Sequence, residues 1–164
     1  MVDRKEASFI LEGRPTPATG RLGPPDGCED AGRFELAVVF TSFDATIAAL
    51  KMAGALASGL SAHITLVVAQ AVPYPLSLED PPVLLDFIRP RLGQIASDSP
   101  VETTIRHYLC RDRLVTLTAV LKRSSIVVIG GRKKWWPTRE KILARRLRRF
   151  GHDVILTETT LSSL

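Results

Sequence analysis

The stretch from Phe34 to Val72, FELAVVFTSFDATIAALKMAGALASGLSAHITLVVAQAV, contains the pattern that decides the predicted fold. Its first part, Phe34–Phe40, is an apolar run of strand length, which is typical of a strand covered on both faces. An alanine-rich segment follows, with small or apolar residues at helical spacing (Ile47, Leu50, Gly54 and Ala57). The run His63–Val72 predicts a second buried strand. A strand, a helix and a strand with short connections form a βαβ unit, so the two strands should be parallel with a right-handed crossover.

Residues that cap helices mark the ends of the predicted helices. Asp44 is expected to cap the helix that precedes His63, and Gly59 suits the end of that helix. Asp80, followed by a proline, predicts the start of a second helix, which Pro90 should kink or split. Asp112 is expected to cap a third helix.

The second half of the chain continues the alternation of strands and helices. Strands are predicted at Val101–Leu109, where alternation suggests a position nearer an edge, at Ser124–Gly130, and at Asp153–Glu158. An amphipathic helix over Pro137–Phe150 should turn Leu143, Leu147 and Phe150 inward, and Gly151 should end it. Five strands and four helices in strict alternation predict a three-layer α/β/α sandwich around a five-stranded parallel sheet.

Length and composition limit the class of protein. The chain has 164 residues, about one domain, and a formal net charge of +5 at pH 7. Residues 1–32 are rich in proline and glycine and predict a flexible tail, whereas residues 33–164 predict the α/β domain. No uninterrupted apolar run of about 18 residues and no secretory signal are evident. We therefore expect a cytoplasmic protein that does not insert into a membrane.

The residue types of catalytic and metal sites do not occur here in the spacings that such sites need. Two cysteines, Cys28 and Cys110, provide neither a disulfide framework nor a metal cluster, and no HxxxH or CxxC spacing occurs. Cys110, at a predicted strand end beside arginines, offers a reactive thiol as an alternative to a structural cysteine, although Asp112 opposes this. His107 should lie on the opposite strand face from Cys110. We expect no enzyme and no metal.

The order and lengths of these elements resemble those of the universal stress protein family over residues 34–158. The resemblance rests on Leu36–Val72, on LCRDRLVTLTAVLKRSSIVVIGG (Leu109–Gly131), and on the closing RRFGHDVILTE (Arg148–Glu158). By this resemblance, the sheet order would be 3-2-1-4-5. Dimers through the last strand are common in the family, so the resemblance also implies a homodimer.

Nucleotide-binding members of that family carry the motif G-x2-G-x9-G-[ST] after the fourth strand, where glycines let backbone amides approach the phosphates. In this chain Gly130 is present, but Lys133 stands in place of the second glycine, and no Gly-Ser or Gly-Thr follows. Thr41 replaces the acidic residue that usually ends the first strand, and Asp44 comes about three residues late. The resemblance thus implies a degenerate site, which disfavours binding of ATP or AMP in the family's manner.

The strand ends still bring polar and basic residues to one edge of the predicted sheet, where ligands of such folds bind. This candidate ligand cleft comprises Thr41, Ser42, Asp44, Gly130, Gly131, Arg132 and Lys133. The pair Gly130-Gly131 could form a nest of amides that holds a phosphate, or it could simply be a tight turn. A protein that binds a nucleotide or another phosphate compound there is one alternative function.

A basic surface follows the cleft in sequence. It comprises Lys134, Arg139, Lys141, Arg145, Arg146, Arg148 and Arg149, with Glu140 as the single acid between Arg132 and Arg149. These residues could be a solvated helix face or could bind a small anion or an acidic partner. Binding of nucleic acid, with Trp135 and Trp136 stacking on bases, is the less favoured alternative. Our preferred hypothesis is a non-enzymatic regulatory or adaptor protein of the stress response, dimeric, acting on a protein partner.

Overall fold

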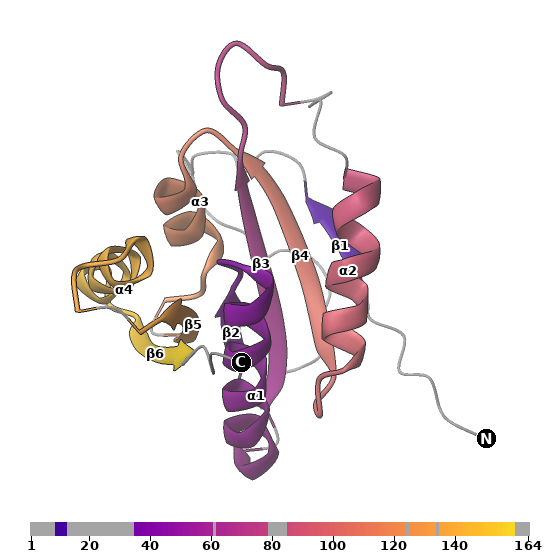
Figure 1. Cartoon of the computed structure of the whole chain (residues 1–164), viewed down its shortest axis with the longest axis vertical. Coiled ribbons are helices and arrows are strands. Elements are labelled where there is room, and N and C mark those ends of the chain that lie inside the picture. The colour runs from indigo at the N-terminus through magenta and orange to yellow at the C-terminus, as the bar shows by residue number, and fades with distance from the viewer. Residues whose placement is uncertain are drawn as a thin grey trace.

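The computed structural model describes residues 9–12, 35–60, 62–78, 85–123, 125–133 and 135–159. Its centre is a six-stranded parallel sheet in the order β1-β4-β3-β2-β5-β6 (Figure 1). The strands are β1 (Phe9–Glu12), β2 (Glu35–Val39), β3 (His63–Ala71), β4 (Thr103–Cys110), β5 (Ile126–Arg132) and β6 (Asp153–Thr159). The helices are α1 (Phe43–Leu60), α2 (Leu85–Ser97), α3 (Arg113–Val120) and α4 (Arg139–Arg149). The predicted five-stranded order 3-2-1-4-5 is confirmed as β4-β3-β2-β5-β6.

The sixth strand, β1, lies within the segment 1–32 that the sequence predicts to be a tail. It pairs in parallel with β4, with Phe9 opposite Ile105 and Glu12 opposite Tyr108. Local periodicity does not reveal such a strand, because a four-residue segment gains its order from hydrogen bonds to a strand far away in sequence. The rest of this segment lies outside the described residues, and the flexible tail stays a prediction there.

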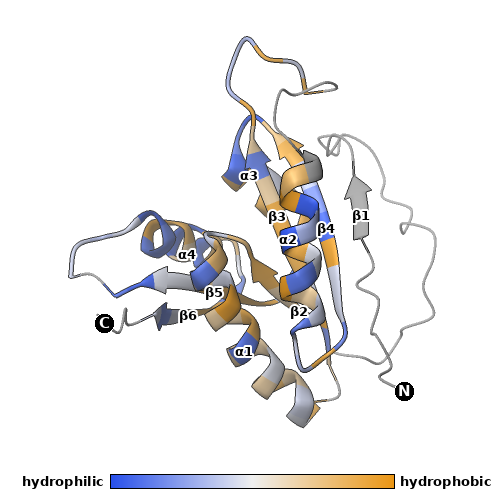
Figure 2. Ribbon diagram, turned by 45° about the vertical axis from the view of Figure 1, so that its right-hand side comes forward, coloured by the Kyte–Doolittle hydropathy of each residue, from blue (hydrophilic) through white to orange (hydrophobic). Residues whose placement is uncertain are grey.

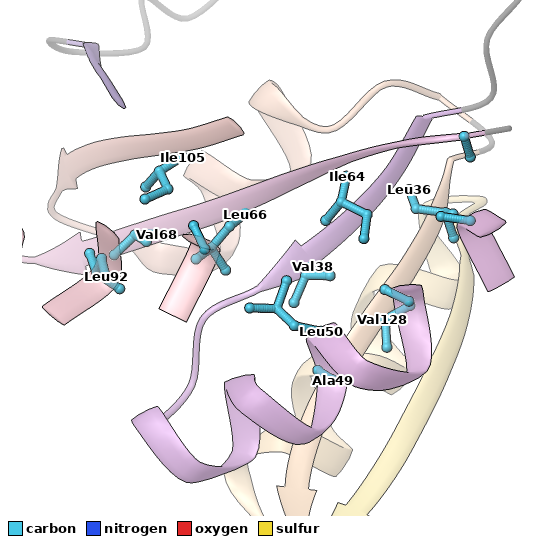
Figure 3. Close-up of a cluster of buried hydrophobic side chains, with 14 residues drawn as sticks. Leu36, Val38, Ala49, Leu50, Ile64, Leu66, Val68, Leu92, Ile105 and Val128 are labelled. Carbon is cyan, nitrogen blue, oxygen red and sulfur yellow. The ribbon is translucent and has the colours of Figure 1, made fainter. Parts of the chain in front are cut away.

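Two hydrophobic clusters hold the helices on opposite faces of the sheet. The first joins α1 and α2 to β2, β3, β4 and β5, and Figure 3 shows Leu50 of α1 beside Val38 and Leu92 of α2 near Val68. The second joins α3 and α4 to the other face, through residues such as Tyr108, Leu117 and Leu147. The three predicted layers follow from this division, because every second residue of a buried strand faces each cluster.

Helix α1 (Phe43–Leu60) begins two residues earlier than the sequence predicts. The Ser42 carbonyl accepts a hydrogen bond from Thr46 N at 2.8 Å, so Ser42, and not Asp44, occupies the N-cap position. Asp44 lies in the first turn, where its negative charge is favourable to the helix dipole. The prediction of Asp44 as a cap was therefore wrong, although its position near the helix start was right.

Helix α1 is also long and apolar enough in composition to cross a membrane. Within this fold it packs on the sheet, and its alanines at positions 49, 53 and 57 belong to the first hydrophobic cluster. That is the position of a core helix. The high hydropathy of α1 is thus accounted for by close packing on the sheet.

The other helices test the remaining predictions. Asp112 caps α3 as predicted, since its carboxylate accepts hydrogen bonds from Leu114 N at 2.8 Å and Val115 N at 3.1 Å. Pro90 does not split α2, which runs without a break from Leu85 to Ser97, while Asp80 lies outside the described residues. Phe150 is 60% exposed and not inward, because it is the C-cap of α4 and leaves the helical periodicity there.

Candidate functional site

A cleft of about 460 Å³ opens at the carboxyl ends of β2 and β5, between the starts of α1 and α4. It is lined by Ser42, Ala45, Arg132, Trp136, Pro137, Thr138, Arg139 and Glu140. Of the residues predicted for a ligand cleft, Ser42 and Arg132 line it. The other five, Thr41, Asp44, Gly130, Gly131 and Lys133, do not.

Strand β5 continues through the glycine pair. Gly130, Gly131 and Arg132 pair in regular register with Thr157, Glu158 and Thr159 of β6. Among the described glycines only Gly151, after α4, has a positive φ, of 88°. Gly130-Gly131 is therefore neither the tight turn nor the nest that the sequence allowed, because sheet pairing with β6 extends beyond it.

The structure gives Gly130 a packing reason to be glycine. A Cβ atom at Gly130 would lie 1.8 Å from the carbonyl oxygen of Ala45, in the first turn of α1. A Cβ atom at Gly131, on the other face, would lie 3.3 Å from Cβ of Glu140 in α4. Gly130 thus lets α1 approach β5 more closely than any side chain would allow.

The end of β2 is tied to the neighbouring elements. Thr41 Oγ1 donates a hydrogen bond to the Gly130 carbonyl at 2.8 Å, and the Thr41 amide donates to Thr46 Oγ1 at 3.4 Å. From the start of α3, the Arg113 guanidinium donates to the Phe40 carbonyl. Strand order reverses between β2 and β5, which is where folds of this class bind ligands. Here Thr41 bridges that switch point, and Arg113 ties α3 to the end of β2.

The lining of the cleft combines positive charge, an indole and a helix start. Arg132 and Arg139 supply the charge, and Trp136 forms part of the wall. Thr138 caps α4 by accepting a hydrogen bond from Lys141 N at 3.3 Å. Sequence reasoning missed Trp136 and Thr138 as cleft residues, although the Pro-Thr pair before an amphipathic helix is a recognisable cap signal. This lining suits a small anion, with one carboxylate, Glu140, opposing it.

The predicted basic surface lies mostly on α4. Two of its members are engaged in the fold, since Lys141 pairs with Glu158 at 3.5 Å and Arg148 Nη2 donates to the Val154 carbonyl at 2.6 Å. Arg139, Arg145, Arg146 and Arg149 are exposed. Figure 2 shows α4 as a hydrophilic helix at one end of the molecule. Lys134 lies outside the described residues.

Cys110 is buried and its surroundings oppose reactivity. The thiol is 3% exposed and donates to the Gln70 carbonyl at 3.4 Å. Burial raises the pKa of Cys110, and this outweighs the lowering by the hydrogen bond with Thr116 and by the charge of Arg113. The alternative of a reactive thiol therefore finds no support in the geometry.

His107 is also buried, and its Nε2 lies 3.0 Å from Gln70 Oε1. Burial, together with the charge of Arg89, lowers the pKa of His107. Strand alternation places His107 and Cys110 on opposite faces of β4, as predicted. Among the described residues no three of His, Cys, Asp and Glu are grouped so that they could hold a metal ion.

Comparisons with known proteins agree with the fold. The structure is similar to the crystal structure of a protein from the universal stress protein family from Burkholderia pseudomallei, with a TM-score of 0.54 and 18% sequence identity. The match covers 79% of this chain and 98% of that chain. No family model and no curated protein matches the sequence. The chain is therefore an α/β protein with a fold like that of the universal stress proteins.

Proposed function

We propose that this chain is a non-enzymatic regulatory or adaptor protein of the universal stress protein kind, in which the nucleotide site is degenerate. One observation carries the proposal: β5 remains paired with β6 through Gly131 and Arg132, where a phosphate loop would have to leave the sheet. Backbone amides that take part in a sheet are not free to surround a phosphate. The close approach of α1 is a packing reason for glycine at position 130 that requires no ligand, which supports the proposal.

The switch point supports the same proposal. A nucleotide at this place would compete with the Thr41 hydrogen bond to Gly130 and with the Arg113 hydrogen bond to Phe40. Both contacts tie the end of β2 to neighbouring elements through the protein's own polar groups, and breaking them would leave partly buried groups without a partner. By resemblance we also propose a homodimer through β6, which among the described strands pairs with β5 alone.

A second candidate function is the binding of a small anion in the cleft. The observation that favours it is the placement of Arg132 and Arg139 around a cleft of about 460 Å³. Such binding would rest on charge, so it should weaken as salt screens the guanidinium groups.

Thermal unfolding in the presence of ATP, ADP or AMP at millimolar concentration tests both candidates. A ligand at about 100 times its Kd stabilises a protein by roughly 2.7 kcal/mol, which raises the Tm of a domain of this size by several degrees. We expect no change in Tm for any nucleotide at moderate salt. A rise that persists at moderate salt would refute the degenerate site.

A pair of variants separates the two candidates. A rise in Tm that occurs at low salt alone and disappears in Arg132→Gln, but not in the exposed control Arg123→Gln, would indicate the anion site. No rise at either salt concentration favours the adaptor. Sedimentation equilibrium, which gives the mass of the protein assembly in solution, tests the proposed homodimer separately.

A further inference from the structure

Exposed aromatic and basic side chains lie on α4 and in the segment before it, and the anion cleft uses only three of them, Arg132, Trp136 and Arg139. Trp135 is 88% and Trp136 57% exposed, and their ring centroids lie 4.8 Å apart. Ile142 and Phe150 are also exposed. We define the tryptophan–arginine surface as Trp135, Trp136, Ile142 and Phe150 with Arg132, Lys133, Arg139, Arg145, Arg146 and Arg149, all of which are exposed.

Within the part of the chain that the structure describes, the ion pairs leave the arginines of this surface without an acidic partner. Of the two described ion pairs, one joins Lys141 to Glu158 and the other joins Lys122 to Glu35, so neither uses an arginine of the surface. Helix α4, which carries most of the surface, lies apart from α2, at the left of Figure 1 where α2 is at the right. A partner with a broad negative face could therefore contact it without obstruction from α2.

We propose that the tryptophan–arginine surface docks on an anionic lipid bilayer, with its arginines at the headgroups and its tryptophans at the boundary between headgroups and acyl chains. Tryptophan favours this boundary because its ring is apolar while its N–H is polar. Arginines near an anionic surface are each attracted to it, and exposed apolar side chains gain by leaving water. This proposal goes beyond the adaptor function and does not depend on it.

Two features favour a bilayer over a single-stranded nucleic acid as the partner. The two indoles are tilted by 31° and lie against each other, so each ring covers part of the face on which a base would stack. Ile142 and Phe150 carry no charge for a nucleic acid, and Ile142 has no ring on which a base could stack. Both offer exposed apolar area to lipid. Salt should weaken either contact, so salt alone does not distinguish them.

Intrinsic fluorescence reports directly on this surface, because Trp135 and Trp136 are the two tryptophans of the chain. The full-length protein would be mixed with phosphatidylcholine vesicles, with or without 30% phosphatidylserine, at low and moderate salt. We expect sedimentation with the anionic vesicles and a shift of the tryptophan emission to shorter wavelength, and neither with neutral vesicles. Binding should be weaker at moderate salt.

Matched variants separate the contributions of charge and apolar contact. The double variant with Arg145→Gln and Arg149→Gln should bind the anionic vesicles about 25-fold more weakly, because each arginine near an anionic surface raises the affinity about fivefold. The control Lys51→Gln with Arg123→Gln removes the same charge from exposed residues outside the surface and should leave most of the binding. Trp135→Ala with Trp136→Ala should also weaken sedimentation, whereas Phe87→Ala, an exposed aromatic on α2, should not.

Four outcomes would overturn the proposal. The first is that the protein does not sediment with anionic vesicles at low salt. The second is that the charge variant and its control weaken vesicle binding equally. The third is sedimentation with no shift of the tryptophan emission. The fourth is that the surface binds single-stranded RNA, or a second copy of the chain, more tightly than it binds anionic vesicles. Binding of a second copy would appear, without vesicles, as an emission shift that depends on protein concentration.

Discussion

The two faces of the sheet are covered by helices of different character. On one face, α1 packs so closely that its Ala45 carbonyl occupies the space beside Gly130, and its buried residues include several alanines. On the other face, α4 buries only Ala144 and Leu147 fully, and its exposed positions are mainly arginines. The comparison teaches that α1 chiefly serves the fold, whereas α4 combines a narrow core contact with an exposed basic side.

The largest effect is expected from the core contact of α4. Leu147→Ala should lower the free energy of unfolding by about 3 kcal/mol, because Leu147 is fully buried and its loss leaves a cavity. Urea denaturation measures this change. The control Ile142→Ala, on the exposed side of the same helix, should cost less than about 1 kcal/mol. Equal costs would mean that α4 is not divided into a core side and an exposed side.

The adjacent glycines test how closely each face is packed. Gly130→Ala should cost about 2–3 kcal/mol, because its Cβ would collide with backbone of α1. Gly131→Ala should cost less than about 1 kcal/mol, because Cβ of Glu140 can give way by a few tenths of an ångström. Chemical denaturation of both variants measures the difference. A greater loss for Gly131→Ala would reverse the comparison between the faces.

Acid should destabilise the α1/α2 side of the sheet through His107, which shares a strand face with Ile105. Its pKa in the folded protein is lowered from the usual 6.5, first by burial and then by Arg89. The unfolded chain therefore takes up a proton first as pH falls below 6.5, and stability is lost from there down to the folded pKa. We expect this loss in denaturation curves between pH 7 and 5. It should be smaller in His107→Gln, and an unchanged slope would exclude His107 as the cause.

The smallest effect is expected on the exposed side of α4. Arg145→Gln and Arg149→Gln should each change the free energy of unfolding by less than about 0.5 kcal/mol, because both side chains are exposed. Arg149, in the last turn, should have the larger effect of the two since it favours the helix dipole. Thermal unfolding at moderate salt measures both changes. A loss of more than about 1 kcal/mol would show that these arginines serve the fold.

Most of the fold could be predicted, and the reasons are local. The apolar runs that became β2, β3 and β5 are buried on both faces, and the caps at Asp112 and Thr138 lie where helices follow them. A continuous apolar run and a cap residue can each be recognised in a short window of sequence. Phe150 was misjudged because the helical periodicity continues in the sequence beyond the residue at which the helix ends.

The candidate site was predicted only in part. Of the residues predicted for a ligand cleft, Ser42 and Arg132 line the cleft of the structure, while Trp136 and Thr138 were not among those predicted and Gly130 packs against α1. The role of a glycine depends on what approaches it, and α1 is far from β5 in sequence. No local pattern distinguishes a glycine that admits a phosphate from one that admits a helix.

By itself the sequence determined the alternation of strands and helices, the parallel βαβ unit and the concentration of basic residues after β5. These features depend on side-chain type and spacing along the chain. Only the tertiary structure decided that β5 continues through Gly130-Gly131, that β1 extends the sheet beside β4, and that Thr41 bridges the switch point. Each of these features depends on contacts between segments that are distant in sequence, and the free energy of such contacts cannot be inferred from any one segment alone.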